Sequence, residues 1–175
     1  MRFRILALAR RREGGEAAGH RRAGNSSKER EPSWSDGKRA NSMRANTQTI
    51  SIHASPDTVV DFLGDPRNLP RWAVGFAKSV KRDGDRWIVS TAQGEVPIRI
   101  VVDRRLGVVD FHLSPAPGKE AVAASRVVPR GDGTEYVFTQ FQEVDMPDEI
   151  FAKNVQALAH ELTVLKALLE IECPR

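Results

Sequence analysis

The chain has 175 residues, of which 40% are apolar and 29% charged, and these values are typical of one ordinary globular domain. They exclude a multidomain machine. A mean hydropathy of −0.42, with no apolar run near the ~18 residues that cross a bilayer, predicts no membrane span. The single cysteine, Cys173, permits neither an intrachain disulfide nor a cysteine metal cluster, which fits a reducing compartment and predicts a cytoplasmic protein.

The net charge of +4 belongs to the N-terminal part of the chain. Residues 1–42 hold 11 Lys and Arg against 5 Asp and Glu, which leaves 16 against 18 for residues 43–175. From Gly14 to Asn46 the composition is too polar to offset chain entropy, so residues 1–46 are predicted to be a disordered basic tail. Met43 reads like a natural start, so an over-extended start is one interpretation of the tail. A nucleic-acid-binding arm is another, but no basic or aromatic repeat supports it, and no nucleic-acid partner is expected.

The first structured elements are expected to follow this tail directly. Residues 48–54 alternate polar and apolar side chains, which is the period of a half-buried strand. Ser55, Pro56 and Asp57 then provide an N-cap, a proline suited to the first helical position and an acid at the helix start. They predict a short helix that ends at Gly64.

A second start signal follows at once in Asp65 and Pro66. It predicts another short helix through Leu69 and Trp72, which Pro70 keeps irregular. Two short helices are therefore expected after the first strand.

The middle of the chain is a β region, because turn residues recur there in place of helical spacing. Asp83-Gly84 is a strong hairpin signal, and Gly94, Gly107 and Gly131 mark further turns. A Pro/Gly-rich loop is expected at 114–119. The strands predicted between these turns are 76–81, 86–91, 96–102, 108–113, 121–128 and 134–141. Connections this short require mostly antiparallel neighbours.

The chain ends with its strongest periodic signal. Pro147 followed by two acids predicts a helix start, and His160 lies directly opposite the apolar stripe of that helix. The stripe residues recur at steps of four and three: Phe151, Val155, Leu158, Leu162, Leu165 and Leu169. We expect a helix of about six turns whose stripe covers the apolar face of the sheet.

The order of strand, two short helices, six strands and a long terminal helix resembles the helix-grip fold of the START-like superfamily, also called SRPBCC. Residues 50–73 (ISIHASPDTVVDFLGDPRNLPRWA) are similar to the opening of its polyketide cyclase/dehydrase-type branch. GDGTEYVFTQFQ and ELTVLKALLE are similar to the last strand and terminal helix of that branch, so the resemblance covers about residues 47–170. It implies an α+β fold in which a curved seven-stranded antiparallel sheet wraps around the terminal helix, with residues 47–172 as a ligand-binding domain.

The same resemblance implies a cavity between the sheet and the terminal helix. On the strands we expect Val89 and Leu113 to point inward with the candidates below, and Arg99 and His112 to point outward, although a slip of one residue reverses each assignment. Trp72 has two interpretations, a plug that packs its helix onto the sheet or an amphipathic wall that contacts ligand. The pocket candidates are Phe62, Trp72, Phe76, Trp87, Ile98, Ile100, Phe111, Tyr136, Phe138, Gln140, Asn154, Leu158 and Leu162.

The sequence contains no pattern of a metal, nucleotide or nucleophile site. The four histidines lack metal-ligand spacing, so neither metal nor other cofactor is expected; His53 and His112 would be the first ligands to test. His112 as a general base competes with the ordinary interpretation of a half-exposed strand histidine. There is no Gly-x-Ser-x-Gly motif and no phosphate-binding glycine pattern.

These observations lead to three functional hypotheses. The first is a protein, monomeric or homodimeric, that binds a hydrophobic small molecule through buried apolar surface. The second is a cofactor-free polyketide cyclase or dehydratase, in which Gln140, Tyr136 or Arg99 polarises a carbonyl or moves a proton. The third is a partner-binding regulatory domain whose cavity is filled by its own side chains.

Overall fold

A computed structural model describes residues 44–172, and their elements follow the expected order. The predicted tail lies outside the described residues except at its end, where Ala45 and Asn46 already belong to the first strand. The strands are β1 (Ala45–Ile52), β2 (Ser79–Asp83), β3 (Arg86–Thr91), β4 (Gly94–Asp103), β5 (Val108–Ala116), β6 (Lys119–Arg130) and β7 (Gly133–Phe141). The helical elements are α1 (Pro56–Gly64), the 3-10 turn η1 (Pro66–Asn68), α2 (Leu69–Trp72) and α3 (Asp148–Glu172).

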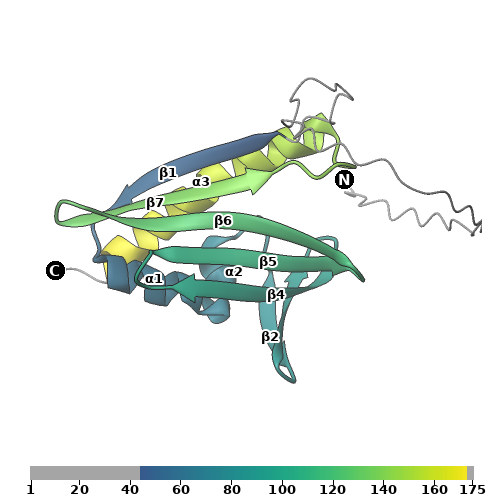
Figure 1. The fold of residues 1–175 in the computed structure, drawn as a ribbon, viewed down its shortest axis with the longest axis horizontal. Coiled ribbons are helices and arrows are strands. Elements are labelled where there is room, and N and C mark those ends of the chain that lie inside the picture. Colours follow the sequence, from purple (N-terminus) through teal and green to yellow (C-terminus); the bar gives the residue numbers. More distant parts are fainter. Residues whose placement is uncertain (1–43, 173–175) are drawn as a thin grey trace, which may run out of the picture. The chain divides into compact units, whose positions relative to one another are not determined.

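The seven strands form one antiparallel sheet in the order β1-β7-β6-β5-β4-β3-β2. In Figure 1 the helices α1, α2 and α3 lie behind this curved sheet, and α3 runs along β1 and β7. All three helices therefore cover one face, which confirms the expected α+β helix-grip architecture.

The two short helices begin at the residues that the sequence indicates. The Ser55 side chain accepts a hydrogen bond from the backbone N–H of Thr58 at 3.2 Å, and Pro56 occupies the first turn of α1. Asp65 accepts from the backbone N–H of Arg67 at 2.9 Å. The second helix is split, because η1 precedes a single α-helical turn in α2.

Several strand ends differ from the sequence expectation. β2 begins at Ser79, three residues late, because backbone hydrogen bonds from Phe76 and Ala77 to the Ala73 carbonyl fold this segment into turns. The expected loop at 114–119 is wrong: β5 and β6 extend into it and meet at a tight turn. The pairing of β5 with β6 shifts register between Leu113 and Ala116. A proline lies in this segment and has no N–H to donate to the ladder, so the pairing is irregular there.

The terminal helix buries the predicted stripe against the sheet. Phe151, Leu158, Leu162, Leu165 and Leu169 are buried, and Val155 is half-buried. His160 is exposed, as its position on the helix requires. The helix has 25 residues, about one turn more than expected. It is held along β1 by the Gln48 amide, which donates to the Val155 carbonyl at 2.8 Å, and by Lys166, which donates to the Ser51 carbonyl at 2.7 Å.

The strand register confirms which side chains face the helices. Trp87, Ile98 and Leu113 are neighbours across β3, β4 and β5, and Ile100 pairs with Phe111 in the next row. All of them belong to the core or pack against it. The next residues along these strands, such as Arg99 and His112, therefore point to the opposite, convex face.

Candidate functional site

A run of aromatic side chains lies between the sheet and the helices. Trp72, at the end of α2, packs against Phe111 of β5 with ring centroids 6.0 Å apart. Phe111 lies 5.9 Å from Phe138, and Phe138 lies 6.3 Å from Tyr136 on the same strand, β7. Four of the predicted pocket residues thus form one continuous apolar wall.

The concave face beside these rings is formed by small side chains. β6 places Ala121, Ala123 and Ser125 on this face, because Ala123 pairs with Phe111 and Ser125 pairs with Phe138. Ala121 and Ala123 are only half-buried, although they lie on the central strands of the sheet. The helices therefore leave this part of the concave face of β6 partly uncovered.

Three polar atoms of this region are buried and find no hydrogen-bond partner among the residues that the structure describes. They are Trp72 Nε1, Tyr136 Oη and Gln140 Nε2. Tyr136 is 0% exposed, and burial raises the pKa of its phenol above the ordinary value. The neighbouring Ser125 hydroxyl opposes this rise, and the charge of Asp110 adds a smaller rise of its own. Tyr136 is therefore a neutral phenol at physiological pH.

A side-chain bridge between β5 and β6 lies behind Tyr136. The backbone N–H of Ser125 donates to the Asp110 carboxylate at 2.9 Å, and the Ser125 hydroxyl donates to the Val109 carbonyl. Arg126 pairs with the same carboxylate at 2.7 Å. The bridge fixes the fully buried Ser125 next to the tyrosine hydroxyl, an arrangement that strand periodicity alone does not predict.

Glu161 is a buried carboxylate of α3 that the sequence analysis missed. Its side chain accepts the backbone N–H groups of Gly75 at 2.8 Å and Phe76 at 3.0 Å, which lie in the segment between α2 and β2. The residue is 7% exposed, and burial raises its pKa, although the two N–H groups and nearby His160 act in the opposite direction. The spacing could have predicted this burial, since Glu161 lies three residues after Leu158 on the buried side of the helix.

This raised pKa predicts a pH-dependent stability for the Glu161→Gln variant. In the folded chain Glu161 keeps its proton to a higher pH than the ordinary 4.5 of a glutamate, so wild type loses stability relative to the variant as pH rises above about 4.5. The Gln carbonyl can still accept from the two N–H groups but does not ionise. Urea unfolding at several pH values measures the difference.

Glu170→Gln is the control of opposite sign on the same helix. Lys166 and the backbone N–H of His53 lower the pKa of Glu170, so wild type gains stability relative to this variant as pH rises. If the stability difference between wild type and variant changed with pH in the same direction for both variants, burial would not dominate the pKa of Glu161.

The remaining pocket candidates lie at the margins of the aromatic run. Phe62 of α1 is half-buried beneath the Arg71 guanidinium at 5.2 Å, and Phe76 is half-buried in the segment that Glu161 holds. Trp87 is half-buried, with Arg82 over its ring at 6.0 Å. Asn154 is exposed, and its amide donates to Met146 Sδ at 3.7 Å rather than reaching toward the sheet.

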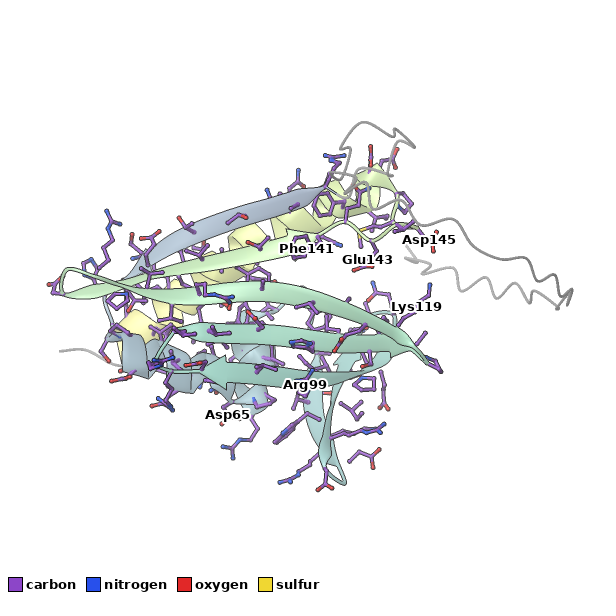
Figure 2. The ribbon with its side chains drawn as sticks, viewed as in Figure 1. Asp65, Arg99, Lys119, Phe141, Glu143 and Asp145 are labelled. Atoms are coloured by element: carbon purple, nitrogen blue, oxygen red, sulfur yellow. The ribbon has the colours of Figure 1, made fainter. Side chains whose placement is uncertain are left out.

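Two of the four polar residues considered for catalysis, Arg99 and His112, lie on the convex face. Arg99, labelled in Figure 2, reaches His112 Nδ1 at 3.2 Å, and the same nitrogen is 2.9 Å from Glu120. The sheet separates this exposed trio from the aromatic run. Among residues 44–172, no group of three His, Cys, Asp or Glu side chains is arranged to hold a metal ion.

A separate groove opens at the surface between α1 and the end of β4. It has a volume of about 880 Å³, and Asp65, labelled in Figure 2, is one of its lining residues. An ion pair between Asp61 and Arg104 joins its two sides. None of the pocket candidates lines this groove, so it is distinct from the concave site. In the part of the chain that the structure describes, no helix is both long and apolar enough to cross a membrane.

The sheet, the covering helices and the site between them define a START-like protein of the helix-grip type. The sequence model of the family described as polyketide cyclase / dehydrase and lipid transport matches residues 43–170. The chain belongs to this family. No curated protein matches the chain.

Solved structures share the fold at low sequence identity. The protein XoxI from Bacillus cereus is 18% identical with a TM-score of 0.59, over 75% of this chain and 99% of its own. The Aha1 dimer from Colwellia psychrerythraea is 18% identical with a TM-score of 0.59, over 74% and 98%. A START superfamily protein from Mycobacterium smegmatis is 16% identical with a TM-score of 0.56, over 74% and 99%. Such identities establish the fold alone.

Proposed function

We propose that this chain binds a hydrophobic small molecule between the concave face of the sheet and α3. The observation that carries the proposal is the half-buried apolar surface over the central strands, where Ala123 lies beside Phe111 and Ala121 beside Leu113. Burial of such surface contributes about 25 cal/mol per Å², so even a small ligand gains several kcal/mol there. Family membership supports the same function, because its description includes lipid transport as well as cyclisation.

Binding is favoured over cyclisation by the position of the polar groups. Of the three side chains considered for catalysis, Arg99 lies on the convex face, and Tyr136, a neutral phenol, and Gln140 can donate a hydrogen bond to a carbonyl but do not supply a base. The buried carboxylate of Glu161 already accepts two backbone N–H groups. These contacts suit recognition and provide no acid/base pair beside the aromatic run.

Ala123→Phe is expected to abolish ligand binding and leave the fold intact, because the added ring occupies the partly uncovered concave face of β6. Native mass spectrometry of protein purified from its own host should show a co-purifying apolar molecule in wild type and none in this variant. The matched control is Ala124→Phe, since Ala124 is the next residue on β6, is equally half-buried and faces the convex side. Urea unfolding establishes that both variants fold.

Three results would contradict this proposal. They are wild type without a bound molecule, a folded Ala123→Phe protein that retains it, and equal loss in both variants. If the purified protein is given a candidate ligand and releases a chemically different molecule, the result would instead support the cyclase or dehydratase hypothesis.

A further inference from the structure

Three buried hydrogen-bonding groups of the concave site make no hydrogen bond to any of residues 44–172. Trp72 Nε1 can only donate, Gln140 Nε2 can only donate, and the Tyr136 hydroxyl can donate or accept. Trp72 is 3% exposed and Tyr136 0% exposed, so water does not satisfy them at the protein surface. Each buried donor without a partner costs about 1–3 kcal/mol, and native proteins contain few of them.

These groups lie on one face of the sheet, spread along the aromatic run. Tyr136, Phe138 and Gln140 alternate along β7 and therefore face the same side of the sheet. Trp72 reaches that side through its contact with Phe111, which in turn packs on Phe138. All three unpaired groups thus border a single aromatic wall.

Two neighbouring polar groups already make hydrogen bonds of their own. The Gln48 amide donates to Asn46 and to the Val155 carbonyl. The Ser125 hydroxyl donates to the Val109 carbonyl but keeps acceptor lone pairs beside the Tyr136 hydroxyl. Trp72 Nε1 and Gln140 Nε2 make no hydrogen bond to the described residues, and a bound molecule with an acceptor oxygen would complement them.

We infer that the concave site recognises a neutral, largely apolar molecule that carries a carbonyl-type oxygen, and that Trp72, Tyr136 and Gln140 are its specificity-determining donors. The inference rests on the proposed function, and it adds the chemical class of the ligand. Aromatic side chains suit a flat frame, and donors suit an acceptor oxygen. All three donors are uncharged, so they do not offset the cost of removing a carboxylate from water.

Fluorene, 9-fluorenone and fluorene-9-carboxylate test this inference with one ring frame. Fluorenone replaces the central CH₂ of fluorene by a carbonyl, so the pair differs by one acceptor oxygen. A net hydrogen bond of about 1 kcal/mol corresponds to a roughly fivefold preference for fluorenone in equilibrium dialysis against the full chain. The carboxylate should bind more weakly than fluorenone.

The donors are tested by Trp72→Phe, Tyr136→Phe and Gln140→Leu. At least one of these variants should bring the ratio of the fluorenone affinity to the fluorene affinity from about five toward one. None should be destabilised in urea by the loss of a hydrogen bond, because the donors are unpaired in the free protein. Thr139→Val is the control, since Thr139 precedes Gln140 on β7 and its hydroxyl bonds to Thr47 on the convex side at 2.8 Å.

The outcomes separate this inference from the proposed function. Equal binding of fluorene and fluorenone, tighter binding of the carboxylate, or an unchanged preference in all three variants would overturn the inference and leave hydrophobic binding in place. If no fluorene compound binds, the chemical structure of the co-purifying molecule tests the inference. A co-purifying molecule without an acceptor oxygen would overturn it. Absence of both probe binding and a co-purifying molecule would refute the proposed function itself.

Discussion

Gly107→Ala is expected to lower the free energy of unfolding by roughly 3–5 kcal/mol, for two reasons that act together. Gly107 has φ +63° in the turn between β4 and β5, a conformation that L side chains rarely adopt. An added Cβ would also lie 2.1 Å from the carbonyl oxygen of Val127, so the backbone of β6 would have to move. The close approach is fixed by the Val127 N–H, which donates to the Gly107 carbonyl at 2.7 Å.

Gly84→Ala separates these two causes. Gly84 has φ +57° in the hairpin turn between β2 and β3, but an added Cβ there meets nothing within 4 Å. Only the conformational cost remains, about 1–2 kcal/mol. Urea unfolding of both variants gives the comparison. Equal losses would show that β6 yields to the new methyl group at Gly107 and that the contact does not constrain the sheet.

The direction of side chains on the strands could be predicted from the sequence because alternation is a local property. On β7, Tyr136 and Phe138 alternate with Val137 and Thr139, and the larger aromatic members face the core as expected. The same reasoning holds for Ile98 and Phe111. Period two fixes the face once one member of a strand is assigned.

Element boundaries were less predictable, because contacts between distant residues decide them. Proline and glycine at 114–119 indicate a loop in isolation, yet pairing with β6 extends β5 to Ala116. The segment before β2 is apolar enough to be read as a strand from Phe76, but turns after α2 and hydrogen bonds to Glu161 hold it outside the sheet.

The polar features of the site depended still more on the fold. Glu161 is an ordinary acid in a helical sequence, and only the N–H groups of Gly75 and Phe76, some 85 residues away, explain its burial. Asp110 is one of many acids in strand sequences, and its bond to Ser125 arises from strand pairing. Trp72 Nε1, Tyr136 Oη and Gln140 Nε2 are unbonded because of the residues packed around them in the described fold. No local sequence pattern predicts that packing.

Leu165→Ala is expected to lower the free energy of unfolding by about 2–5 kcal/mol, the range for truncating a buried leucine. Leu165 is 0% exposed and belongs to the core cluster together with Leu162 and Leu169 on the inner side of α3. The upper part of the range is expected, because α3 is held along β1 at Val155 and at Lys166 and has little freedom to move into the space left behind.

The control for this prediction is His160→Ala on the outer side of the same helix. His160 is exposed, so its truncation should change the free energy of unfolding by no more than about 0.5 kcal/mol. Both substitutions place a strong helix former in a helix interior, so helix propensity does not explain a difference between them. Similar losses at the two positions would mean that the helix is not covered on one side only, and the placement of α3 against the concave face would have to be abandoned.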